Sequence, residues 1–116
     1  VYSHAQKWLT SHPPILCTGF ESSLKQIASL FDWSEGYAAL NEHDESTITP
    51  GLFVIGPSVR QGNLIFCFIY KFRQRFAVVA SAIAQRLGID TTPLETYRQE
   101  GLFLDDLSCC DNDCIC

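Results

Sequence analysis

The feature that most constrains this chain is a short apolar run at residues 52–55, which ends at Gly56 and Pro57. Four consecutive apolar residues closed by a turn are typical of a strand buried on both faces, as in a parallel sheet. A long helix is expected over residues 64–87, with Asn63 as its N-cap and Gly88 just past its end. A buried strand followed by a long helix predicts an α/β fold.

Shorter elements are expected on both sides of this unit. Residues 15–17 form a short apolar run that predicts a strand, and Ser22 or Ser23 can cap a helix that ends before Asp32. A brief strand is expected over residues 37–40. The acidic residues 41–46 predict a loop that faces solvent, since carboxylates are rarely buried without partners.

A second helix is expected near the C-terminus of the folded part. Thr92 is its predicted cap, Pro93 occupies its first position, Glu95 completes a capping box, and Gly101 ends it.

The long helix has two predicted faces when it is projected at 100° per residue. The cationic stripe holds Lys71, Gln74, Arg75, Gln85 and Arg86, and the opposite apolar face holds Phe66, Ile69, Phe76, Ala80, Ile83 and Leu87. We expect the apolar face to be buried, and Lys71 and Arg75 to be solvated. Arg73 projects among the apolar residues, so it is predicted to be buried against an anion or carbonyl groups.

Charge and composition exclude several classes of protein. Apolar residues make up 47% of the 116 residues and charged residues 18%, which excludes disorder over most of the chain. The net charge of −5 argues against a polycationic nucleic-acid binder, although residues 58–88 carry five basic residues and no acid. Residues 64–84 are apolar enough to suggest a membrane span. However, Lys71, Arg73 and Arg75 lie in the middle of that stretch, at a cost of about 2.5–3.5 kcal/mol each in hydrocarbon, so no membrane is expected.

Two segments carry a resemblance to a known family. Residues 14–20, Pro-Ile-Leu-Cys-Thr-Gly-Phe, resemble the ATG(F/Y) segment that links the two nucleotide domains of FAD- and NAD(P)H-dependent oxidoreductases. Residues 47–56, Thr-Ile-Thr-Pro-Gly-Leu-Phe-Val-Ile-Gly, resemble the last strand of their FAD domain, T-x-x-P-x-(L/I)-(F/Y)-hydrophobic-x-G-D. The order and spacing also match. The chain therefore resembles the C-terminal part of a two-domain flavoprotein of the pyridine nucleotide-disulfide oxidoreductase or flavin monooxygenase type.

This resemblance implies a domain organisation and a fold. Residues 1–20 would be the end of the NAD(P)-binding domain and its linker, residues 21–103 the C-terminal part of the FAD-binding domain, and residues 104–116 a flexible tail. The fold would be a partial Rossmann-like FAD/NAD(P)-binding fold, made of the terminal strand and the long helix, with a disordered cysteine-rich tail. The chain has no methionine and no G-x-G-x-x-G, so we expect a fragment whose dinucleotide fingerprints lie upstream.

The resemblance also implies cofactors and site residues. Gly56 and the loop of Pro57, Ser58, Val59 and Arg60 would face FAD, whereas NAD(P)H would be bound mainly by the upstream sequence. The family usually has an acid after the glycine that contacts the ribityl chain, and Pro57 replaces it here, which is more similar to the monooxygenase branch. The implied reaction is hydride transfer from NAD(P)H to FAD, with electrons passed to a thiol, a disulfide or oxygen. This part alone is expected to be inactive.

The expected partners follow from the same resemblance. They are the upstream part of the same polypeptide, a second copy in a homodimer, and a thiol or disulfide substrate, in the cytoplasm and without nucleic acid or membrane.

Four cysteines in the last eight residues form a separate candidate site: Cys109, Cys110, Cys114 and Cys116. Cys109 and Cys110 resemble in position the C-terminal redox shuttles of some flavoprotein disulfide reductases. Alternatively, all four thiolates can bind a soft metal such as Zn²⁺ or Cu⁺, or the tail has no specific role. The competing hypothesis for the whole chain is a small soft-metal-binding or thiol-redox protein without flavin.

Overall fold

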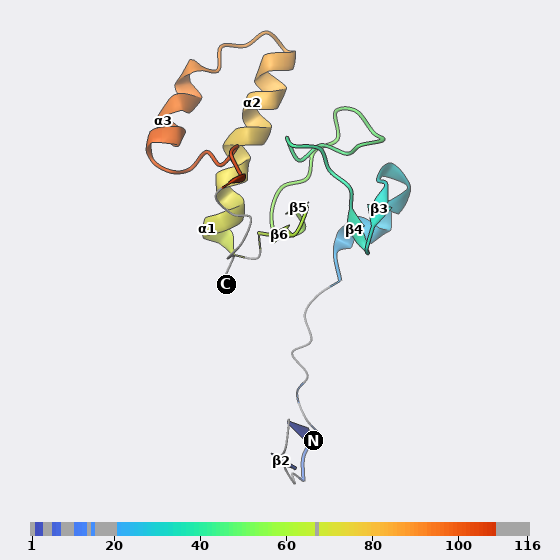
Figure 1. Cartoon of the computed structure of the whole chain (residues 1–116). Helices are drawn as coiled ribbons and strands as arrows, with labels where there is room; N and C mark the ends of the chain where they lie inside the picture. Colours follow the sequence, from blue (N-terminus) through green and yellow to red (C-terminus); the bar gives the residue numbers. More distant parts are fainter. Residues whose placement is uncertain are drawn as a thin grey trace.

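The computed structural model describes residues 2–3, 6–7, 11–13, 15, 21–66 and 68–108 (Figure 1). Its strands are β1 (Tyr2–Ser3), β2 (Gln6–Lys7), β3 (Trp33–Ser34), β4 (Tyr37–Ala38), β5 (Arg60–Gln61) and β6 (Leu64–Ile65). Its α-helices are α1 (Ile69–Phe72), α2 (Phe76–Arg86) and α3 (Glu95–Gln99), and its 3-10 helices are η1 (Ser23–Leu30), η2 (Arg73–Arg75) and η3 (Thr92–Leu94).

The described strands form three separate antiparallel pairs: β1 with β2, β3 with β4, and β5 with β6. Two tight turns explain two of these hairpins. Glu35 and Gly36 both have positive φ, 52° and 83°, which matches the right-handed twist of the paired strands β3 and β4. Gly62, with a φ of 56°, begins the turn between β5 and β6. This mixture of helices and short strand pairs is consistent with a part of an α/β protein.

The prediction of a buried parallel strand over residues 52–55 is wrong for the described residues. Phe53 forms one isolated antiparallel bridge with Glu45, and the two neighbours of Phe53 in the chain also bond to that segment. Val54 is buried, whereas the Ile55 side chain is 57% exposed. The apolar run therefore pairs along one side with residues 44–46, so only alternate side chains enter the core.

The long helix begins later than predicted. Leu64 and Ile65 pair with β5 because the Gly62 turn folds them back, so Asn63 is part of a hairpin turn and no helix cap. The helical stretch starts at Ile69 and runs through α1, η2 and α2. Its predicted end is confirmed: Gly88 has a φ of 67°, and the Ile89 amide bonds to the Ala84 carbonyl at 2.8 Å.

The two predicted faces of the helix are wrong in part: Phe66 is buried and Gln85 and Arg86 are exposed as predicted, but other residues differ. Arg75 is completely buried and Arg73 is exposed, while Ile69 and Leu87 of the predicted buried face are 69% and 68% exposed. The buried residues of α2 are Ala77, Val78, Val79, Ser81 and Ala82. The 3-10 turn at η2 advances about 120° per residue where an α-helix advances 100°, which displaces the projection at this point. Remote acidic residues also draw Arg75 inward, as described below.

The core lies between the loop segments and the start of the helical stretch. Its buried apolar residues are Phe31, Ala38, Val54, Val59, Leu64 and Phe66, and Leu104 and Leu107 pack against them from the C-terminal segment. The loop that carries Gly56 is therefore held by side chains on both sides of it, Val54 and Val59.

The remaining predicted elements agree in part. Ser22 caps η1 by accepting from the Leu24 amide at 3.2 Å, but this helix is 3-10 and not α. The expected strand over residues 37–40 is present as β4. The predicted Thr92 side-chain cap is not formed; instead Asp90 accepts from both the amide and the hydroxyl of Thr92. The expected strand over residues 15–17 lies mostly outside the described residues.

None of the helices in the described part has the length and apolar character needed to cross a membrane.

Candidate functional site

The predicted cofactor loop is a β-turn. The Val59 amide donates to the Gly56 carbonyl at 3.2 Å, and this closes a four-residue turn with Pro57 and Ser58 at its centre. Proline suits this position because its fixed φ matches the second residue of common turns. Val59 is 1% exposed and anchors the turn in the core.

Two side chains of the loop bond to neighbouring elements. The Ser58 hydroxyl lies 3.0 Å from the Ser22 hydroxyl, which ties the turn to the start of η1. The Arg60 guanidinium lies 4.1 Å from the centre of the Tyr37 ring and donates from Nε to the Gly62 carbonyl at 2.9 Å. It also lies 4.0 Å from Glu35 Oε2, so Arg60 is oriented by three neighbours.

Gly56 has a backbone conformation that glycine adopts readily and other residues rarely adopt. Its φ of +98° is a region that side chains other than glycine rarely adopt, and a Cβ built there meets no atom within 4 Å. Among the described residues, no hydrogen bond satisfies the amides of Gly56 and Ser58. The backbone therefore offers two donors and open space on one side of the turn.

The loop alone does not enclose a cofactor. The pocket next to Arg60 has a volume of about 160 Å³ and is lined from β3, β4 and the β5–β6 turn. This is below the 300–1,000 Å³ range typical of small-molecule sites. The described residues therefore do not form a site of cofactor size at this turn. The helical stretch begins at Ile69, after the β5–β6 hairpin, so the Gly56 turn does not lead directly into a helix.

The acidic segment, residues 41–46, is predicted to face solvent, and this is wrong for residues 44–46, although Glu42 is exposed. Asp44, Glu45 and Ser46 are 0%, 3% and 4% exposed. The Val54 amide donates to the Asp44 carbonyl at 2.8 Å, and the Ser46 amide donates to Leu52 at 2.8 Å. This segment therefore supports the strand-like run that ends at Gly56.

Asp44 is buried because Arg75 neutralises it. Arg75 Nε donates to Asp44 Oδ2 at 2.8 Å and Nη2 to Oδ1 at 2.9 Å, a bidentate ion pair between two side chains that are both 0% exposed. Arg75 also donates to the carbonyls of Leu104 and Glu42, at 2.5 and 2.6 Å. Gln61 of β5 completes the network by donating to Asp44 Oδ1 at 2.7 Å. One buried arginine thus joins the helix, the acidic segment and the C-terminal segment.

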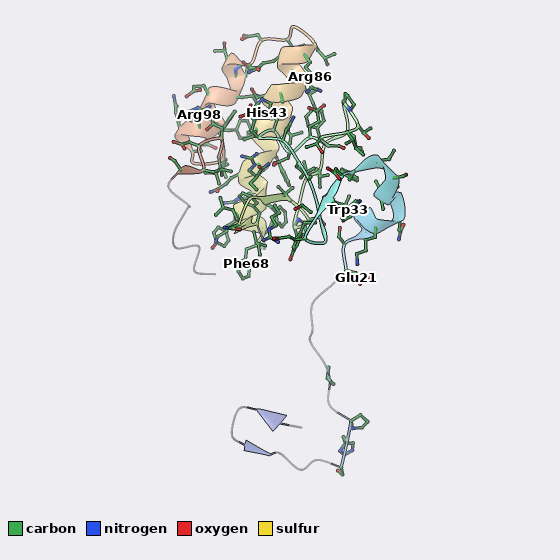
Figure 2. The ribbon with its side chains drawn as sticks, turned by 45° about the vertical axis from the view of Figure 1, so that its right-hand side comes forward. Glu21, Trp33, His43, Phe68, Arg86 and Arg98 are labelled. Carbon is green, nitrogen blue, oxygen red and sulfur yellow. The ribbon has the colours of Figure 1, made fainter. Side chains whose placement is uncertain are left out.

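Glu45 forms the second ion pair, with Arg86. Arg86 lies near the end of α2, where Figure 2 labels it. The Gly51 amide also donates to Glu45 at 2.6 Å, and the Asn41 side chain donates at 3.1 Å. The hydrogen bonds from Arg86, and then that from Gly51, lower the pKa of Glu45 from its usual 4.5 to about 2. The same pair raises the pKa of Arg86.

The Glu45 pair predicts how stability depends on pH. Because the pKa of Glu45 is lower in the folded chain, its contribution is fully present above pH 4.5 and is lost as the pH falls toward 2. We expect the urea midpoint to fall over this range, and to fall less in Glu45→Gln, which has no carboxylate to protonate. Asp90, Asp105 and Asp106 also have lowered pKa values, so some slope remains in the variant. Identical slopes in the two proteins would contradict the assignment to Glu45.

A signal for these buried acids was present in the sequence. Residues 58–88 contain five basic residues and no acid, so any buried arginine of that stretch needs a carboxylate from elsewhere. Asn41 is a second signal, because its side chain accepts from the amides of His43 and Glu45 and turns the acids inward.

The cysteine tail cannot be tested by the geometry. Cys109, Cys110, Cys114 and Cys116 lie outside the described residues, as does Cys67. Within the described ranges, no cluster of three or more His, Cys, Asp and Glu side chains could hold a metal ion. The segment at residues 14–20 that carries the first family motif also lies almost entirely outside the described part.

The two motifs and the glycine turn that ends the second resemble those of FAD- and NAD(P)H-dependent oxidoreductases. The comparison with protein families agrees: residues 1–56 match the family described as pyridine nucleotide-disulphide oxidoreductase. The matched segment contains both motifs and stops at Gly56. The match covers 56 of the 116 residues and supports, at a coarse level, a function of the pyridine nucleotide-disulphide oxidoreductase type.

Proposed function

We propose that this chain is the C-terminal part of an FAD- and NAD(P)H-dependent oxidoreductase, in which residues 56–60 form one wall of the flavin site. The observation that carries the proposal is Gly56, where the family match ends, φ is +98° and the position of a Cβ is open. Bound FAD would supply the chemistry, taking a hydride from NAD(P)H and passing electrons to an acceptor.

The residues of the turn have distinct proposed roles. Gly56 lets the backbone come close to the cofactor, and the amides of Gly56 and Ser58 can donate to its oxygens. Pro57 has no amide hydrogen and replaces the acid that the family usually has there, so it leaves only its carbonyl for a contact. Arg60, fixed over Tyr37, brings a positive charge to a site for an anionic dinucleotide.

The exposed face of the helix supports a role as part of a larger unit. Ile69, Ile83 and Leu87 are 69%, 40% and 68% exposed and lie along the helical stretch. An apolar row of this kind normally packs against another element. In the proposal this element belongs to the remaining part of the flavoprotein, and the present chain alone is inactive.

The tail cysteines complete the proposal. Cys109 and Cys110 would exchange electrons with a thiol or disulfide substrate. The alternative use is capture of a soft metal by these two together with Cys114 and Cys116.

The test compares two glycines in the complete polypeptide that contains this chain. Gly51 has a φ of +85° and, like Gly56, an open Cβ position, so alanine strains the backbone similarly at both sites, by about 1 kcal/mol or more. We expect Gly56→Ala to lower the molar ratio of bound flavin several-fold, because its methyl group enters the space that the cofactor needs. Gly51→Ala should keep the ratio of the unmodified protein. The ratio is measured by flavin absorption after removal of free cofactor.

Two outcomes would contradict the proposal. Equal molar ratios of bound flavin in the two variants would mean that Gly56 shapes the turn but does not contact the cofactor. A complete polypeptide that binds no flavin but binds Zn²⁺ or Cu⁺ would favour the soft-metal or thiol-redox alternative.

A further inference from the structure

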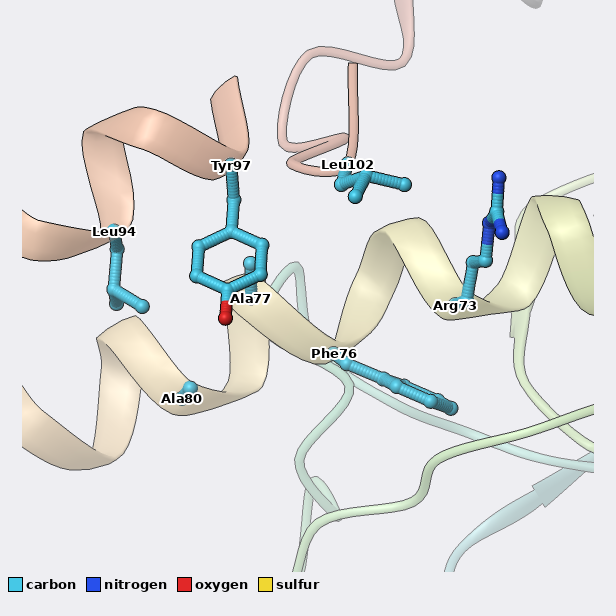
Figure 3. A pocket seen from close by; sticks show the side chains of 7 residues that line it. All are labelled: Arg73, Phe76, Ala77, Ala80, Leu94, Tyr97 and Leu102. Carbon is cyan, nitrogen blue, oxygen red and sulfur yellow. The ribbon is translucent and has the colours of Figure 1, made fainter. Parts of the chain in front are cut away.

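A pocket lies between the helical stretch and α3 (Figure 3). Its volume is about 370 Å³, within the range typical of small-molecule sites. Its lining residues are Arg73, Phe76, Ala77, Ala80, Leu94, Tyr97 and Leu102.

The sequence explains why this space is hollow. Ala77 and Ala80 present only methyl groups on the side of α2 that Tyr97 approaches from α3 (Figure 3). Gly101, with a φ of 68°, reverses the chain after α3, and the Leu102 amide bonds to the Tyr97 carbonyl at 2.7 Å. Leu102 is therefore held over the pocket as a third side. Small residues on one helix and large ones opposite leave a cavity that the chain does not fill.

The chemistry of the lining is apolar with one cation. Six of the seven residues are apolar or aromatic, and none is acidic. Arg73 has no carboxylate partner among the described residues. The other four of the five arginines, all of them described, each form an ion pair with a carboxylate. The Arg73 side chain makes no ion pair or hydrogen bond with another described residue, and only its backbone is bonded within the helical stretch.

We propose that this pocket binds a small amphipathic carboxylate, with its apolar body against Phe76, Ala80 and Tyr97 and its carboxylate on Arg73. A guanidinium matches a carboxylate with two parallel hydrogen bonds, and aromatic side chains suit a flat apolar body. The absence of acid from residues 58–88 means that the helix itself does not repel the anion. The site is independent of the proposed flavin site.

The test uses 4-phenylbutyrate and its uncharged analogue 4-phenylbutanol, titrated into the protein by calorimetry. We expect the carboxylate to bind about tenfold or more tightly than the alcohol, and Arg73→Gln to remove that difference. Ala80→Phe should abolish binding of both, because its ring fills the pocket from an exposed position that tolerates it. Lys25→Gln, which removes an exposed cation from η1, should leave both affinities unchanged.

The result that would overturn the proposal is equally specific. Equal affinity for the acid and the alcohol would exclude a role for Arg73. Unchanged binding in Ala80→Phe, or no perturbation of the Tyr97 ring resonances by 4-phenylbutyrate in NMR spectra, would exclude the pocket.

Discussion

Asp44→Ala should lower the free energy of unfolding by about 3–5 kcal/mol, because it leaves the Arg75 guanidinium buried without its counter-charge. Both side chains are 0% exposed, so water cannot replace the lost carboxylate unless the structure opens. The measurement is urea unfolding of the variant and the unmodified chain at neutral pH.

The controls separate the buried charge from general effects of mutation. Glu21→Ala breaks an exposed pair with Lys25 and should cost about 0.5 kcal/mol or less. The double variant Asp44→Leu with Arg75→Met should recover part of the loss, since it removes both charges. If Asp44→Ala costs no more than Glu21→Ala, the Asp44–Arg75 pair does not hold the acidic segment in place.

Phe31→Ala should also cost about 3–5 kcal/mol, because it leaves a cavity in the main core. Phe31 is 3% exposed and meets Trp33 edge to face, with ring centres 6.4 Å apart. The core cluster joins Phe31 to Val54 and Val59, which flank the Gly56 turn, so the turn should lose its support as well. Thermal or urea unfolding measures the loss.

The matched control for Phe31 is Phe68→Ala. Phe68 is 50% exposed, so its removal creates no enclosed cavity and should cost much less. A loss of the same size in both variants would mean that the cluster around Phe31 is not the core of this chain.

Short-range features were predictable from the sequence. The Ser22 cap, the end of the helix at Gly88 and the turn at Gly56 all depend on residues within one turn of each other. The family resemblance was also readable, because the order and spacing of its motifs are properties of the chain itself. The start of the helix was not, because Asn63 is an equally good turn residue and the Gly62 turn pairs Leu64 with β5.

The candidate site was predicted only in outline. The position of the Gly56 turn followed from the motif, but its support by a buried acidic segment did not. Residues 41–46 read as a solvated loop because nothing nearby in the sequence neutralises them. Their partners, Arg75 and Arg86, lie 31 and 41 residues farther along the chain.

The sequence by itself therefore determined local turns, the Ser22 cap and the resemblance to an oxidoreductase family, since these depend on neighbouring residues and their spacing. Only the tertiary structure decided which face of the helix is buried. Periodicity favours burial of the apolar row, but a buried carboxylate requires a cation, and the pairing of Asp44 with Arg75 buries Arg75 of the predicted cationic stripe. With Arg75 buried, Arg73 of the same helical stretch is exposed and lines the pocket between α2 and α3.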